Sequence, residues 1–212
     1  MVLKSAFINL IFASISAATP APTTTAFQSL TDIQLTVPFV HQNNDLNEEN
    51  IVFGYTTCGP AALTMVLKHS GMSIGINEVL DRIPNYVYIK GDQFYDLPEG
   101  TKYFNKKYEY IDNSPKSIYK SLKNGSPLVM NIQNYDGLHG HAIVVTGIRG
   151  YDEATNTAKA LVVHDPFKGA YVTFEYHDNF NLKQPEGFIN PIGIMDSFFI
   201  VNSTNSLIAQ SL

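Results

Sequence analysis

The order in which helical and extended segments follow one another is the strongest constraint on how this chain can fold. Helical spacing of apolar residues marks the first half, over residues 58–69, 75–83 and 114–123. Runs of apolar and β-branched residues in the second half predict strands near residues 127–132, 140–148, 161–164, 170–176 and 197–202. Because the helices come first and the strands later, we predict an α+β fold in which the N-terminal helices pack on an antiparallel sheet.

The composition fits one globular domain, which we place at residues 36–205. Of the 212 residues, 44% are hydrophobic and 12% aromatic, which is ample for one core and too little for two. Residues 86–110 read as an irregular aromatic stretch. The formal net charge is -5 and the isoelectric point about 5.6, so nucleic acid is not an expected partner. The oligomeric state cannot be predicted from these features.

The N-terminus has the layout of a secretory signal peptide over residues 1–18. Lys4 supplies a basic residue, residues 6–13 are mostly apolar, and Ser16 and Ala18 form the small pair before a cleavage point. The alternative is a short apolar helix that packs on the domain or is kept as a membrane anchor. We expect cleavage, no stable membrane insertion afterwards, and a secreted protein, periplasmic or cell-envelope in a bacterium. Residues 19–35 read as a linker or short pro-segment.

Cys58 is the only cysteine, and its place at the start of a helix favours a nucleophile. The first turn offers unbonded N–H groups and the positive end of the helix dipole, which favour a thiolate. Thr57 is the expected N-cap, Gly59 leaves the thiol uncrowded, and Pro60 suits the first turn. The alternative is a buried cysteine that acts as a small hydrophobic residue.

A cysteine nucleophile needs a base, an orienting acid and an oxyanion donor. His141 opens a β-branched strand and is the candidate base. Asp165 ends another strand before Pro166, where its carboxylate can accept the Nδ1–H of a neighbouring imidazole. Gln42 follows a short extended segment upstream of the helix and is the candidate oxyanion donor. Each has an ordinary alternative: a histidine satisfied by backbone, a strand-to-turn Asp-Pro, and a solvated glutamine.

Metal binding is not expected from this sequence, and no cofactor is predicted. The chain has no CxxC spacing for zinc. His139 and His141 share a strand face, but no neighbouring motif supplies further ligands. In a secreted protein, a lone thiol indicates reactivity rather than a disulfide framework.

Four motifs in order resemble the papain-fold cysteine peptidases of the bacteriocin-processing, or double-glycine leader peptidase, type. They are Val37-Pro38-Phe39 leading to Gln42, Cys58-Gly59-Pro60-Ala61, residues 140–147, and Asp165-Pro166. The resemblance is to stand-alone secreted relatives, covers residues 36–202 and implies a papain-like fold. It implies that Gln42 is the oxyanion glutamine, Cys58 the nucleophile, His141 the general base and Asp165 the orienting aspartate. Cleavage after paired glycines is not carried over, because the chain has no ATPase motif and no helical membrane bundle.

The sequence therefore predicts a secreted thiol-dependent hydrolase that cleaves peptide bonds in a peptide or protein substrate. The same thiol chemistry permits acyl transfer to an amine, as in transglutaminase-like relatives on a similar fold. A catalytically silent module that keeps its cleft for peptide binding is the alternative from a different class, and an amidase acting on cell-wall stem peptides is a further one.

Overall fold

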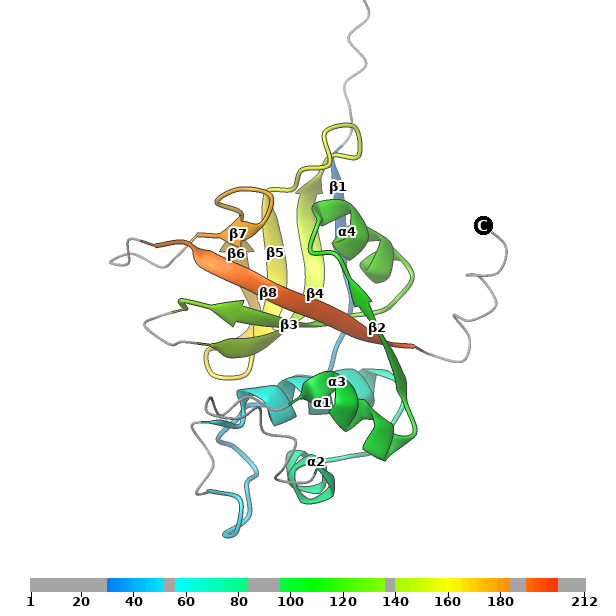
Figure 1. The fold of residues 1–212 in the computed structure, drawn as a ribbon, viewed down its shortest axis with the longest axis vertical. Coiled ribbons are helices and arrows are strands. Elements are labelled where there is room, and N and C mark those ends of the chain that lie inside the picture. Colours follow the sequence, from blue (N-terminus) through cyan, green and yellow to red (C-terminus); the bar gives the residue numbers. More distant parts are fainter. Residues whose placement is uncertain (1–29, 52–55, 84–95, 136–139, 184–189, 202–212) are drawn as a thin grey trace, which may run out of the picture.

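A single antiparallel sheet forms the centre of the molecule. The computed structural model describes residues 30–51, 56–83, 96–135, 140–183 and 190–201. The strand order is β2-β8-β3-β4-β5-β6, with β1 paired to β4 and β7 paired to β8 (Figure 1). The strands are β1 Thr31–Gln34, β2 Lys107–Ile111, β3 Leu128–Gln133, β4 His141–Tyr151, β5 Ala160–Asp165, β6 Gly169–Glu175, β7 Asn181–Leu182 and β8 Ile192–Val201.

The long strand β4 organises the sheet because its two halves have different neighbours. The first half pairs with β3, from Ile132 opposite His141 to Leu128 opposite Val145. The second half pairs with β1, where Gln34 lies opposite Gly147. A Cβ atom at position 147 would lie 2.6 Å from the carbonyl oxygen of Ile33, so a glycine is needed for β1 to approach.

Helices lie on both faces of this sheet. The helices α1 and α2, with the short α3, lie on one side, and α4 lies on the other (Figure 1). Their bounds are α1 Cys58–His69, α2 Ile76–Arg82, α3 Leu97–Gly100, the 3₁₀ helix η3 Thr101–Phe104 and α4 Pro115–Lys123. The helix α1 is buried from Gly59 to Leu67, so its position is fixed on all sides.

Two hydrophobic cores result from the alternation of side chains along the strands. The core on the α1 side contains Val129, Val144 and Phe198, and the core on the α4 side contains Ile143 and Val145. We call these the α1 core and the α4 core.

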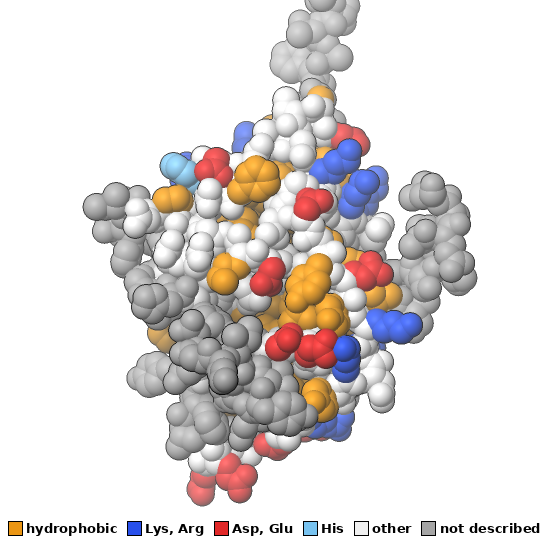
Figure 2. Space-filling model, viewed as in Figure 1, with side chains coloured by type: hydrophobic (Ala, Val, Ile, Leu, Met, Phe, Trp, Pro, Cys, Tyr) orange, Lys and Arg blue, Asp and Glu red, His pale blue; other side chains and the backbone are white. Residues whose placement is uncertain are grey.

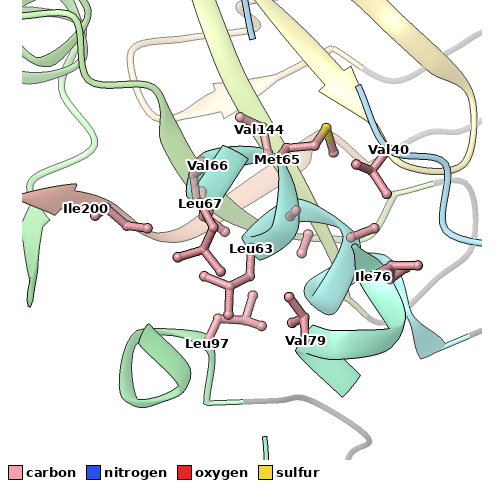
Figure 3. Packing of buried hydrophobic residues seen from close by; sticks show 14 of the residues in the cluster. Val40, Leu63, Met65, Val66, Leu67, Ile76, Val79, Leu97, Val144 and Ile200 are labelled. Carbon is pink, nitrogen blue, oxygen red and sulfur yellow. The ribbon is translucent and has the colours of Figure 1, made fainter. Parts of the chain in front are cut away.

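Packing within the α1 core holds α1 rigidly. Leu63 points toward Leu97 and Val79, whereas Met65 points toward Val40 on another side of the helix (Figure 3). Leu63 and Met65 are both inaccessible to solvent. Truncating such a residue to alanine costs about 2–5 kcal/mol, so the helix that carries Cys58 cannot shift without a large loss of packing.

The structure confirms the α+β class, the antiparallel sheet and the main helices. Ser114 accepts a hydrogen bond from the backbone N–H of Ser117, as expected of an N-cap residue, and Asn124 ends α4. The five expected strands correspond to β3, β4, β5, β6 and β8. The strand β8 begins at Ile192, earlier than the alternation near residue 197 indicated.

Two segments depart from the sequence-based expectations. Residues 31–34, expected within the linker, form β1. Ile33 packs against the α4 core, and the backbone of β1 pairs with the second half of β4. The expected irregular stretch contains α3, η3 and β2 in its described part, residues 96–110. The strand β2 was missed because, as an edge strand next to β8, it exposes most of its side chains.

Candidate active site

Cys58 is the first residue of α1 and packs at the edge of the α1 core. The residue is partly exposed, in contrast to the buried run that follows it. Thr57 occupies the N-cap position, but its hydroxyl makes no capping bond and instead donates to the carbonyl oxygen of Gln42 at 2.7 Å. Thr57 is therefore the N-cap residue, as expected, but its side chain does not cap the helix. The backbone N–H groups of the first turn point toward the N-terminal end of α1, where Cys58 lies.

His141 is the first residue of β4 and is buried. Its Nε2 atom lies 2.8 Å from Oδ1 of Asp165. Because the ionised carboxylate can only accept, Nε2 donates this bond. The sequence-based prediction placed Nδ1 in this role, and that prediction is wrong. Nδ1 is thus the ring nitrogen left for Cys58, whose thiol has a hydrogen-bond interaction with this imidazole.

Asp165 is the last residue of β5, and both of its carboxylate oxygens accept hydrogen bonds. Oδ1 accepts from His141 and from the backbone N–H groups of Phe167 at 2.9 Å and Lys168 at 3.2 Å. Oδ2 accepts from the hydroxyl of Tyr135 at 2.6 Å. Burial raises the pKa of Asp165, but the hydrogen bond and charge of His141, with the Tyr135 and Phe167 donors, lower it to about 2. Asp165 is therefore ionised over the working range of most enzymes.

Tyr135 is a member of this site that the sequence analysis missed. Its ring is buried and stacks on the ring of His141, with centroids 5.2 Å apart and planes 19° apart. The chain contains 12 tyrosines, and no local motif distinguishes this one. The only sequence signal is its position a few residues before His141, which by itself predicts nothing about the hydroxyl.

The thiol and the imidazole favour their charged forms together. Burial raises the pKa of Cys58, but the hydrogen bond and positive charge of His141, with the backbone N–H groups of Ala142 and Gly59, bring it below its ordinary value. Burial lowers the pKa of His141, but hydrogen bonds to Asp165 and Cys58 and their negative charges raise it to about 9. Both shifts favour a thiolate–imidazolium pair over a neutral thiol and a neutral imidazole.

Gln42 is fixed beside both halves of the site by its backbone. Its N–H donates to the carbonyl oxygen of Pro166 at 2.9 Å, next to Asp165, and its carbonyl accepts from Thr57, next to Cys58. The residue is 4% exposed, so it is not the solvated glutamine of the alternative interpretation. The end of β5 and the start of α1 thus converge on the segment that contains Gln42.

A second buried histidine holds the chain that leads to Gln42. His164 donates from Nε2 to the carbonyl oxygen of Val37 at 2.9 Å, and its Nδ1 accepts the N–H of Tyr171 at 3.1 Å. Burial lowers the pKa of His164 below its ordinary value. With one nitrogen donating and the other accepting, this ring is neutral.

A metal centre has no support in the part of the chain that the structure describes. No group of three or more His, Cys, Asp and Glu residues there could hold a metal ion. His139 lies outside the described residues. Within the described ranges, no helix is long and apolar enough to cross a bilayer.

A partly exposed cysteine at the start of a buried helix, packed on an antiparallel sheet, defines the papain-like class of fold. The sequence model described as "Peptidase_C39 like family" matches residues 34–183, and the chain belongs to this family of cysteine peptidases. No curated protein matches the chain closely enough to report.

Proposed function

We propose that the protein is a secreted, stand-alone cysteine peptidase that cleaves peptide bonds with Cys58, His141, Asp165 and Gln42. The observation that carries this proposal is the 2.8 Å bond from His141 to a buried, fully hydrogen-bonded Asp165, on an imidazole that also interacts with Cys58. This arrangement supplies a nucleophile, a proton carrier and a group that orients it.

In the proposed reaction, the Cys58 thiolate attacks the carbonyl carbon of the scissile amide. The backbone N–H of Cys58 and the amide of Gln42 stabilise the negative charge on the carbonyl oxygen. The His141 imidazolium gives its proton to the leaving amine and then accepts one from the water that hydrolyses the thioester. Asp165 holds the imidazole in the tautomer and orientation that both steps need.

The face of the molecule drawn in Figure 2 is not a basic surface. Acidic and hydrophobic side chains occupy the middle of the face in Figure 2, over β2 and β8, whereas Lys and Arg lie toward its margin. Such a face does not offer the basic stripe that nucleic acid binding requires.

The first test is site-specific alkylation, which is simple here because the chain has one cysteine. The rate of iodoacetamide reaction with Cys58 should stay high well below the ordinary thiol pKa of about 8.5, and this should be lost in His141→Ala. An ordinary titration in the wild type, with the protein shown to be folded, would contradict the proposed ion pair and favour a silent peptide-binding module.

Substrate turnover then tests the reaction itself. Incubation with a mixed peptide library, followed by mass spectrometry, should show new termini for the wild type and none for Cys58→Ala, whose folding is checked by circular dichroism. An amine acceptor added in parallel separates hydrolysis from acyl transfer, since the transferase would give an amide adduct in place of the acid. Peptidoglycan stem peptides in the same assay test the amidase.

Secretion has its own test, because residues 1–18 lie outside the described residues. Expression in a secreting host should give a protein in the medium or envelope whose first residue is Thr19. Retention of Lys4 in the mature protein would overturn the signal-peptide assignment.

A further inference from the structure

Tyr135 lies outside the proposed catalytic set, but its side chain contacts two members of that set. Its hydroxyl donates to Oδ2 of Asp165 at 2.6 Å, and its ring stacks on His141. A single rigid ring therefore contacts both the carboxylate and the imidazole that the carboxylate must hold. Tyr135 is also 1% exposed, so neither contact competes with bulk water.

The two carboxylate oxygens of Asp165 accept hydrogen bonds from different donors. Oδ1 receives His141 and two backbone N–H groups, whereas Tyr135 is the donor to Oδ2. Rotation of the carboxylate about its Cβ–Cγ bond would bring Oδ2 toward the imidazole and break the hydrogen bonds that Oδ1 accepts. The short bond from Tyr135 opposes this rotation, because a buried charged acceptor loses much when its donor is removed.

The stacked ring restricts His141 in a second direction. The planes of Tyr135 and His141 differ by 19°, so the imidazole cannot tilt without losing contact area with the phenol ring. With Nε2 fixed on Asp165, the plane of the imidazole decides where Nδ1 points, and hence whether it meets Cys58.

Other groups fix Tyr135 in turn. Phe174 of β6 packs edge-on against its ring at a centroid distance of 5.5 Å and an angle of 80°. The Lys168 ammonium lies 4.7 Å from the ring centroid. Lys168, His141 and Asp165 are thus charged or titratable groups that contact this tyrosine.

We propose that Tyr135 is a positioning residue that locks the Asp165 carboxylate and the His141 imidazole in the orientation in which Nδ1 faces the Cys58 thiol. The inference rests on the proposed function, since it concerns the same site. It assigns Tyr135 no contact with the substrate.

The test is Tyr135→Phe, which removes the hydroxyl and keeps the ring. Tyr176→Phe is the matched control: Tyr176 lies in the same α4 core, and its buried hydroxyl has no hydrogen-bond partner among the described residues. In Tyr135→Phe, a less well-held Asp165 stabilises the imidazolium less, so the thiolate forms at higher pH. The iodoacetamide inflection should move up by about one pH unit, and kcat should fall about tenfold with KM unchanged. Tyr176→Phe should match the wild type in both.

A double-mutant cycle separates positioning from a general structural effect. In an Asp165→Asn background, Tyr135→Phe should change the alkylation profile and kcat by less than about twofold, since the tyrosine then has no carboxylate to hold. Equal effects in both backgrounds would overturn the proposal. So would a wild-type profile for the folded Tyr135→Phe protein.

Alkylation needs no substrate, so the two proposals fail in different ways. An ordinary thiol titration in the wild type itself would reject the proposed function. A low-pH thiolate in the wild type that persists unchanged in Tyr135→Phe would reject the role of Tyr135 alone. Thermal unfolding of each variant shows whether a change in rate comes with a loss of folded protein.

Discussion

His141 and His164 are buried on adjacent strands, but their pKa values are shifted in opposite directions. His141 lies beside the carboxylate of Asp165 and the thiol of Cys58, and its pKa is raised to about 9 despite its burial. His164 forms hydrogen bonds with backbone groups, the Val37 carbonyl and the Tyr171 N–H, and its ring packs edge-on against aromatic rings that carry no charge. Its burial lowers its pKa. The residue type and the burial are alike, so the difference comes from the partners.

His141 belongs to the candidate active site, whereas His164 supports the chain segment beside it. His164 faces the α1 core, since it lies opposite Val144 in the β4–β5 pairing. Asp165, the next residue, faces the other side of the sheet and holds His141. One strand end thus supplies a neutral histidine that anchors the segment toward Gln42 and a carboxylate that keeps a second histidine charged.

Exchanging each histidine for alanine should give the largest contrast. His141→Ala should lower kcat by about 10⁴-fold, because a triad member is lost. His164→Ala should lower kcat far less but reduce the free energy of unfolding by about 2–4 kcal/mol, since it leaves a cavity and unpaired backbone groups. Peptide hydrolysis and urea unfolding measure the two effects. Similar catalytic losses in two equally folded variants would break the comparison.

Removing the side chain of Gln42 should have the next largest effect. Gln42→Ala should lower kcat by about 10²–10³-fold, the usual loss for one oxyanion donor, with alkylation of Cys58 unchanged. Asn43→Ala is the control, since Asn43 follows Gln42 in the same loop and its side chain is exposed. An unaltered kcat in Gln42→Ala would assign the oxyanion role to other donors.

The two histidines should give the stability opposite slopes with pH. The pKa of His141 is about 9 in the folded protein and about 6.5 unfolded, so its contribution is complete below pH 6.5 and is lost as pH rises through 9. His164 has a lowered pKa, so its contribution is complete above pH 6.5 and is lost as pH falls through the lowered value.

Urea midpoints measured against pH in two variants test these slopes. His141→Gln should remove the alkaline decline, which amounts to about 3 kcal/mol at most, and His164→Gln should remove the acidic one. If the alkaline decline survives in His141→Gln, another group causes it. The pH–rate profile should also fall near pH 9, where His141 loses its proton.

Lys168 should give the smallest effect. Its ammonium lies near the ring of Tyr135, but the side chain is exposed, so the interaction is worth about 0.5–1 kcal/mol. Lys168→Met should change kcat less than about threefold and leave the alkylation inflection of Cys58 in place. A shift as large as that of Tyr135→Phe would mean that the charge of Lys168, rather than Asp165, governs the pair.

Three residues of this site can be found from local sequence, because each stands at the end of a recognisable element. Cys58 begins an apolar helix, His141 begins a β-branched run, and Asp165 ends a strand before a proline. Tyr135 has no such signal, since its role depends on a carboxylate that lies 30 positions away along the chain. The expected Nδ1 bond is not formed, and Thr57 occupies the N-cap position without side-chain capping, for a related reason: both hydrogen bonds depend on where a distant group lies.

By itself, the sequence determined the α+β class, the helix that carries Cys58 and the strands that end at the site. Periodicity and turn chemistry are local properties, and they act within a few residues. Only the tertiary structure decided that β1 joins β4, which ring nitrogen of His141 meets Asp165, and that His164 stays neutral. Hydrogen bonds and charges depend on distance in space, so partners remote in sequence set these properties once the sheet has brought them together.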